Sequence, residues 1–89
     1  MAKVKEEKTE IVVHIKYNES GGEEKYSFDT HMNIPLRRIF LDFCDRLGLV
    51  YSSIAFTFDG ARIRETQTPR DLGLENDDLI DAFNHQIGD

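Results

Sequence analysis

The sequence is poor in the residues that build disulfides and metal centres. It has one cysteine in 89 residues, Cys44, which excludes an internal disulfide and is compatible with a reducing compartment. A structural zinc site needs about four ligands. The histidines, which are scattered along the chain without the spacing of a metal site, are His14, His31 and His85. We therefore expect neither a metal site nor a cofactor.

Long hydrophobic runs are also absent. No apolar segment approaches the roughly 20 residues needed to span a bilayer. The first ten residues, MAKVKEEKTE, lack the apolar stretch of a secretory signal. Hydrophobic residues make up 39% and charged residues 31% of the chain, which is typical of one globular domain of this length. We expect a protein of the nucleus, and also of the cytoplasm, that does not bind membranes.

Basic residues are missing from the last part of the chain. Residues 71–89 contain six acids and no Lys or Arg, and the whole chain has a formal net charge of −6. Such a segment would repel the phosphates of nucleic acid and attract a basic protein surface. An acidic rim that only keeps the domain soluble is the alternative interpretation.

The order of predicted elements indicates an α+β fold. Two alternating segments flank turn-forming residues at 18–22, and every second residue faces one side: Ile11, Val13 and Ile15 in the first segment, Tyr26, Phe28 and Thr30 in the second. This pattern predicts a hairpin, with His14 as an exposed strand residue rather than a ligand.

A helix is expected after the hairpin. Asn33 is positioned to cap it and Pro35 to lie in its first turn, and apolar residues recur at three- and four-residue steps until Gly48 ends it. Cys44 falls within this helix beside the apolar stripe, where a cysteine is usually inert packing.

Shorter elements complete the chain. Residues 54–58 and 61–63 are predicted strands around an Asp59-Gly60 turn, residues 68–73 a single helical turn, and residues 79–83 a last strand. A hairpin, a diagonal helix and a mixed sheet describe the β-grasp arrangement. A plant-type ferredoxin on this scaffold is excluded because its cluster needs four cysteines.

Several segments resemble the SUMO family of ubiquitin-like modifiers. The resemblance runs in register from about residue 10 to residue 89. Its segments are PLRRI at 35–39, FCDRLG at 43–48, SIAFTFDGARI at 53–63, Thr68-Pro69, LGLENDDLID at 72–81 and QIG at 86–88. It implies a ubiquitin-like domain over residues 11–84, between a flexible N-terminal tail at 1–10 and a flexible C-terminal tail at 85–89.

The resemblance implies a protein tag that is not an enzyme. Its carboxyl end would be adenylated, passed as a thioester to a conjugating enzyme and joined to a target lysine. Gly88-Asp89 stands where the family has Gly-Gly, and the added side chain and charge should impair activation in the narrow enzyme tunnels. An altered or truncated chain, a variant with adapted enzymes, and a domain that no longer conjugates remain open as explanations.

An acceptor site is also expected in the N-terminal tail. Val4-Lys5-Glu6-Glu7 fits the apolar-Lys-x-acid pattern at which such modifiers are attached, so Lys5 could accept chain growth.

The family's partners add a short apolar strand to the sheet edge beside the helix. By position, the groove for SUMO-interacting motifs is expected to contain Tyr26, Phe28, Thr30, Ile39 and Phe43, with Arg38 and Arg46 on its rim. Asp29 and His31 replace usual lysines, and Thr30 replaces a larger residue, so motifs flanked by acids should bind weakly. Core packing for the two phenylalanines and a solvated helix face for the two arginines are the alternatives.

A second surface is implied for the conjugating enzyme, near Arg62, Glu75, Asp77 and Asp78. The expected partners are the activating and conjugating enzymes, a SUMO protease, target proteins and proteins with SUMO-interacting motifs, and the domain is expected to be a monomer.

Two other functions remain open. One is a SUMO-like interaction domain that binds the conjugating enzyme without being transferred, and the other is a small enzyme that uses Cys44 with a histidine.

Overall fold

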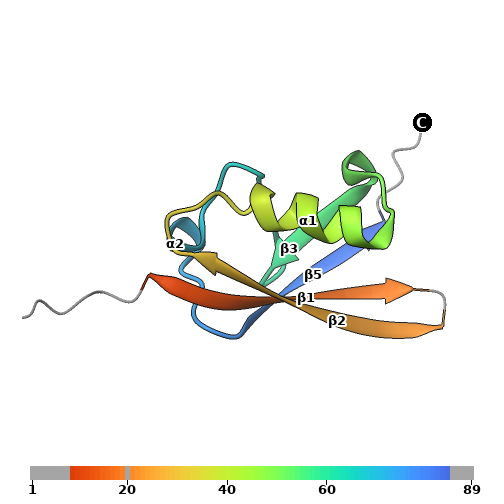
Figure 1. Cartoon of the computed structure of the whole chain (residues 1–89), viewed down its shortest axis with the longest axis horizontal. Coiled ribbons are helices and arrows are strands. Elements are labelled where there is room, and N and C mark those ends of the chain that lie inside the picture. The colour runs from red at the N-terminus through yellow and green to blue at the C-terminus, as the bar shows by residue number, and fades with distance from the viewer. Residues whose placement is uncertain (1–8, 20, 85–89) are drawn as a thin grey trace, which may run out of the picture.

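The computed structural model describes residues 9–19 and 21–84 (Figure 1). Within them the elements are, in order, β1 (Glu10–Glu19), β2 (Gly22–His31), α1 (Arg37–Leu47), a 3₁₀ turn (Tyr51–Ser53), β3 (Ile54–Phe58), β4 (Ala61–Arg62), α2 (Pro69–Leu72) and β5 (Asp78–Asn84). No helix of these residues is long and apolar enough to cross a bilayer. The predicted tails at 1–8 and 85–89 lie outside the described residues.

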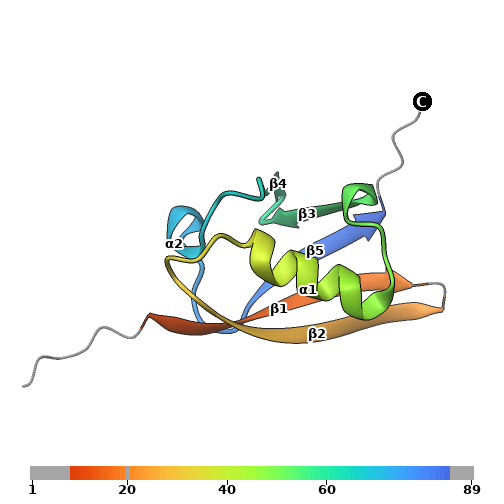
Figure 2. The ribbon, with the colours of Figure 1, turned by 45° about the horizontal axis from the view of Figure 1, so that its top comes forward.

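The described strands form one mixed sheet in the order β2-β1-β5-β3-β4. The strands β1 and β5 are parallel, and the other neighbours are antiparallel. Helix α1 crosses one face of this sheet (Figure 2). The predicted fold class, an α+β β-grasp with one main helix, is confirmed. This order leaves β2 at one edge, next to the helix.

The first hairpin follows the predicted alternation, but its strands are longer than predicted. The register pairs Glu10 with His31 at one end and Glu19 with Gly22 at the other. Gly21 has φ of +121°, a backbone conformation that favours glycine in the turn. Because the side chains alternate, Val13 and Phe28 are buried as partners in this register, while Ser27 and Asp29 on the other face are exposed.

The beginning of α1 differs from the prediction. The N-cap residue is Leu36, which makes no side-chain cap hydrogen bond, and the helix begins at Arg37. Asn33 is therefore not the cap: its Oδ1 accepts a hydrogen bond of 2.7 Å from Nε of Arg70. Pro35 lies before the helix rather than in its first turn. The predicted end is confirmed, because Gly48 takes a left-handed conformation with φ of 68°.

The second half contains the predicted short elements. Asp59 and Gly60, both at positive φ, form the turn between β3 and β4. Thr68 caps α2 through a capping box with Asp71: the Asp71 backbone N–H donates to Thr68 Oγ1 at 3.1 Å, and the Thr68 N–H donates to Asp71 Oδ2 at 3.0 Å. The 3₁₀ turn before β3 was not predicted.

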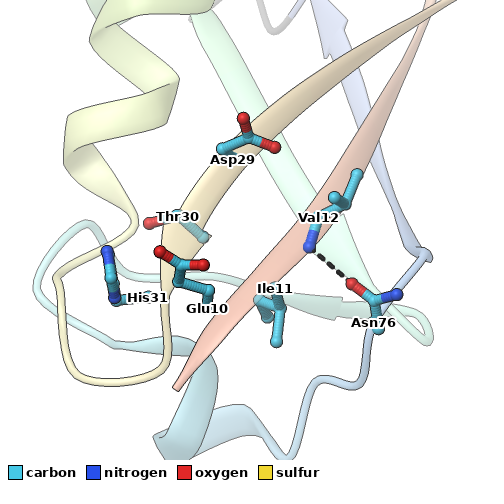
Figure 3. Close-up of a pocket in the computed structure, with 7 residues that line it drawn as sticks. All are labelled: Glu10, Ile11, Val12, Asp29, Thr30, His31 and Asn76. Carbon is cyan, nitrogen blue, oxygen red and sulfur yellow. Dashed lines mark hydrogen bonds between the residues drawn. The ribbon is translucent and has the colours of Figure 1, made fainter. Parts of the chain in front are cut away.

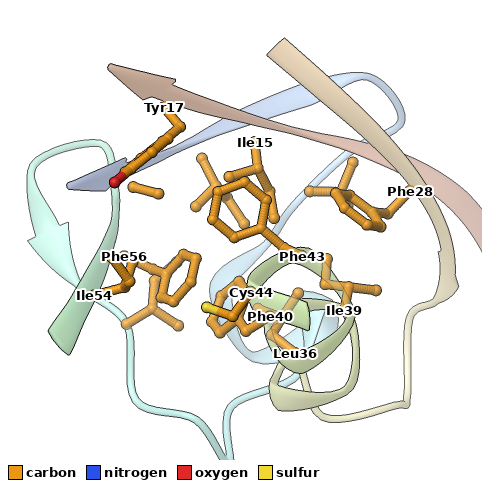
Figure 4. Close-up of a cluster of buried hydrophobic side chains, with 14 of the residues drawn as sticks. Ile15, Tyr17, Phe28, Leu36, Ile39, Phe40, Phe43, Cys44, Ile54 and Phe56 are labelled. Atoms are coloured by element: carbon orange, nitrogen blue, oxygen red, sulfur yellow. The ribbon is translucent and has the colours of Figure 1, made fainter. Parts of the chain in front are cut away.

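The core lies between α1 and the sheet (Figure 4). The rings of Phe40 and Phe56 stack with centroids 3.8 Å apart, and Phe43 makes edge contacts with several other rings. Cys44 is buried in this cluster, so its interpretation as packing is confirmed. Burial raises the pKa of its thiol, which disfavours the reactive thiolate.

Candidate functional site

A groove of about 580 Å³ runs between edge strand β2 and helix α1. Its lining residues are Ser27, Phe28, Asp29, Arg38, Ile39, Asp42 and Arg46. Within the described residues no strand pairs with β2 beside Ser27, Phe28 and Asp29 on the side away from β1. The groove therefore adjoins a strand edge, the arrangement that can accept an added strand.

Arg46 covers the aromatic part of this groove. Its guanidinium carbon lies 5.1 Å from the centroid of the Phe28 ring, within cation–π distance. Its Nη2 also donates to Oδ2 of Asp42 at 3.3 Å, one helical turn earlier. Both partners of this ion pair are exposed, so it adds little stability. It nevertheless offsets the positive charge that Arg46 presents to a ligand.

Four of the seven residues predicted for the groove line it: Phe28, Arg38, Ile39 and Arg46. The other three lie elsewhere. Phe43 is fully buried beneath the groove, Thr30 lines the hollow where β1 begins and β2 ends, and the half-buried ring of Tyr26 meets that of Phe43 edge-on at 5.6 Å. Phe43 can shape the groove only through the residues that cover it.

Two lining residues were missed by the sequence reasoning, Ser27 and Asp42. The four-residue spacing between Asp42 and Arg46 is the signal that could have found the ion pair. Ser27 gave no comparable signal, because a polar side chain on the exposed face of a strand is ordinary.

A second hollow of about 340 Å³ lies where β1 begins and β2 ends (Figure 3). Its lining residues are Glu10, Ile11, Val12, Asp29, Thr30, His31 and Asn76. The side chain of Asn76 closes one side, where its Oδ1 accepts from the Val12 backbone N–H at 2.7 Å. Two carboxylates, those of Glu10 and Asp29, border the hollow, and Asp29 also borders the groove.

The acidic segment before β5 is held by backbone contacts. The N–H of Asp77 donates to the Val12 carbonyl at 2.7 Å, and the N–H of Glu75 donates to Oδ2 of Asp78 at 2.8 Å. Asp77 has φ of 72°, and its Oδ1 lies 3.0 Å from Nε2 of His14. Two of the three predicted carboxylates therefore have partners within the domain.

Arg62 lies apart from these acids. It is on β4, opposite Thr57, with β3 between it and β5. Within the described residues it forms no ion pair with Glu75, Asp77 or Asp78. It lines instead a hollow of about 390 Å³ that also contains Tyr51, Arg64 and Glu65. The surface predicted for the conjugating enzyme therefore consists of two separate places on the sheet.

The hydroxyl of Tyr51 donates to Oε1 of Glu65 at 2.9 Å. Burial, followed by this hydrogen bond and the negative charge of Glu65, raises the pKa of Tyr51 to about 12. The phenol is therefore a donor throughout the neutral range.

Three predicted site residues lie outside the described residues: Lys5, Gly88 and Asp89. Among the residues that the structure describes, no group of three or more His, Cys, Asp or Glu side chains is placed to hold a metal ion.

The mixed sheet, its crossing helix and the groove at its edge define a ubiquitin-like β-grasp protein. The ubiquitin of Caldiarchaeum subterraneum superposes with a TM-score of 0.76 over 90% of this chain and 99% of its own. At 18% identity that likeness concerns the fold alone.

Sequence comparison identifies the family. The family model described as "Ubiquitin-2 like Rad60 SUMO-like" matches residues 6–83. Small ubiquitin-related modifier 2 of Homo sapiens is 38% identical over 82 residues, which cover 91% of this chain and 86% of that protein. The solution structure of SUMO from Trypanosoma brucei superposes with a TM-score of 0.71 at 32% identity, covering 100% of this chain and 84% of that one. The chain belongs to the SUMO-like family of ubiquitin-related modifiers.

Proposed function

We propose that this chain is a protein modifier that is joined through its C-terminal tail to target lysines and is recognised by short apolar motifs in the groove between β2 and α1. Membership of the SUMO-like family supports the first part. The single observation that carries the second part is the groove itself, which lies beside a sheet edge and is lined by Phe28 and Ile39.

Recognition would proceed by strand addition. A peptide beside Ser27, Phe28 and Asp29 would extend the sheet by one strand, with main-chain hydrogen bonds supplying part of the affinity. Every second side chain of that strand would point toward Phe28, Ile39 and the aliphatic part of Arg46. Selectivity for apolar residues would follow where a side chain lies against Phe28 and Ile39, because neither offers a partner to a polar or charged group that loses its hydration there.

An NMR titration tests the groove. A synthetic peptide with four consecutive Val and Ile residues flanked by glutamine is added to the ¹⁵N-labelled chain. We expect the largest shift changes at backbone amides of 27–29 and of 38–46. Shift changes confined to β3 and β4, at the other edge of the sheet, would contradict this assignment. Phe28→Leu keeps an apolar residue but removes the ring under Arg46, and it should weaken binding.

The conjugation machinery would be the second class of partner. Exposed Asp77, with Glu75 beside it, forms an acidic surface that suits a basic face of a conjugating enzyme, and attraction of this kind weakens as salt is raised. Arg62 would contribute a separate contact from β4. Because Asp77 is also bound by His14, its charge would be only partly available to a partner.

The remaining assignments follow from the same proposal. The activating enzyme and a SUMO protease would act on Gly88 and Asp89, and Lys5 would serve as a chain acceptor. The curated relatives are named modifiers, and we infer that this chain likewise acts as a monomeric tag without an activity of its own, in the nucleus and the cytoplasm. Buried Cys44 with its raised pKa is poorly suited to be a nucleophile.

A further inference from the structure

The outward-facing side chains of β2 would lie directly beside those of an added strand. Alternation places Lys25, Ser27 and Asp29 on the exposed face of the sheet, opposite the buried Phe28 and Thr30. In an added strand, the residue opposite Asp29 would have its Cβ about 4.5–5.5 Å from the Cβ of Asp29. The charge of Asp29 would therefore select the side chain at that position.

The carboxylate of Asp29 has no competing partner among the described residues. Asp29 is exposed and forms neither an ion pair nor a side-chain hydrogen bond with them. The hollow beside it adds the carboxylate of Glu10 and the imidazole of His31, and no lysine or arginine lines that hollow (Figure 3). The strand end at Asp29 is therefore acidic on the outward face.

The cations of the groove lie on its other side. Arg38 and Arg46 extend from α1, so they face the inward side chains of an added strand. Arg46 is already paired with Asp42. Lys25 is on the same face as Asp29 but four residues away, about 13 Å along the strand, which exceeds the screening length of about 8 Å at physiological salt. None of these three cations therefore neutralises the charge of Asp29 at the position beside it in the added strand.

We propose that the groove prefers an apolar strand with a basic flank, a Lys or Arg that lies beside Asp29 on the exposed face of the sheet. This inference rests on the proposed strand addition and specifies the chemistry of the partner. An opposite-charge pair across two strands stabilises their contact, and two acids in the same place would repel.

Two peptides test the preference. Both have the same core of four Val and Ile residues, and they differ only at one end, which has two lysines or two glutamines. Because neighbouring residues of a strand point to opposite faces, one of the two lysines faces outward. The peptide can run along β2 in either direction, so its basic end can lie beside Asp29. Dissociation constants are measured by fluorescence anisotropy at low and at physiological salt.

The lysine peptide is expected to bind the chain without substitutions roughly two- to fivefold more tightly than the glutamine peptide does. Asp29→Asn should abolish the difference, and Asp29→Lys should reverse it. Asp45→Asn is the matched control: it removes the same charge from an exposed residue of α1 that does not line the groove, and it should leave the difference unchanged. Higher salt should reduce the preference.

Any of four results would overturn the inference. Equal binding of the two peptides, or tighter binding of the glutamine peptide, removes the basic preference but leaves the apolar groove intact. A preference for lysine that survives Asp29→Asn places the selecting charge elsewhere. If neither peptide binds, the proposed groove fails and the inference fails with it. ¹⁵N spectra of each variant confirm that the fold is retained.

Discussion

Nε2 of His14 lies 3.0 Å from Oδ1 of Asp77, which joins β1 to the loop before β5 across 63 residues of sequence. The other ring nitrogen, Nδ1, lies 2.8 Å from Oγ of Ser27 on β2. One imidazole thus connects two strands and the acidic loop on the exposed face of the sheet. It also fixes the direction of the Asp77 carboxylate, which we propose as part of the surface for the conjugating enzyme.

His14→Ala should lower the free energy of unfolding by about 0.5–1.5 kcal/mol, because two side-chain hydrogen bonds at a partly exposed site are lost. A double-mutant cycle with Asp77→Gly isolates the contact, and we expect a coupling of about 0.2–1 kcal/mol because Asp77 is largely exposed. Urea denaturation provides both values. The same cycle between His14 and Asp45 should give no coupling, and equal values for the two pairs would refute the contact.

Phe40→Ala should destabilise the domain by about 3–5 kcal/mol. The ring is 1% exposed and stacks on Phe56, so its removal leaves a cavity under the helix. Leu41, the next residue, is 41% exposed, and Leu41→Ala should change stability by less than about 0.5 kcal/mol. Thermal unfolding measures the loss of stability in each of the two variants. Similar losses would contradict the orientation of α1 in which Phe40 faces the core and Leu41 faces solvent.

Thr68→Ala should cost about 1 kcal/mol, because Thr68 caps the single turn of α2 through its hydrogen bond with the Asp71 N–H. Thr66→Ala is the control, since Thr66 is exposed and lies outside the capping box. Urea denaturation measures the difference. If both variants lose the same stability, the capping box is not the cause.

The contribution of Tyr51 to stability should depend on alkaline pH. In the unfolded chain a tyrosine loses its proton near its ordinary pKa of 10.0, whereas folding raises the pKa of Tyr51 to about 12. The folded state therefore binds more protons between these values, and the stability that Tyr51 provides is present below pH 10 and is lost as the pH rises toward 12.

Comparison with Tyr51→Phe isolates this effect from other titrating groups. The unmodified chain should be the more stable of the two at pH 9, and its advantage should shrink steadily above pH 10. Tyrosinate absorbance reports the titration directly, and Glu65→Gln should lower the pKa of Tyr51 because it removes the negative charge beside the hydroxyl while leaving an amide oxygen that can accept its hydrogen bond. A constant difference in stability between pH 9 and 12 would exclude the effect.

Local patterns in the sequence predicted most of the elements. Alternation at Val13 and Phe28 identified the buried face of the hairpin, and Gly48 identified the end of α1, because both signals come from residues within one element. Asn33 shows the limit of this reasoning. It has the chemistry of a cap, but its amide accepts from Arg70, which is 37 residues away and comes close only in the folded chain.

The groove could be predicted only in part for the same reason. Phe28 and Ile39 were found through the family resemblance, but Phe43 lies beneath the groove and Thr30 lines the second hollow, which depends on how α1 and β1 pack on β2. The contact between His14 and Asp77 gave no sequence signal, because parallel pairing of β1 with β5 creates it. These contacts depend on long-range pairing between strands, which local patterns in the sequence do not reveal.

The central claim is that the chain is transferred as a modifier, and a thioester assay tests it most directly. The chain with Asp89→Gly is incubated with the SUMO activating enzyme, the conjugating enzyme and ATP, then analysed on a non-reducing gel beside the same chain with Asp89 and with Asp89→Ala. We predict a thiol-sensitive band at the conjugating enzyme for the glycine variant and much less for the other two. If the glycine variant forms no thioester while it still binds the conjugating enzyme, the chain is an interaction domain rather than a modifier.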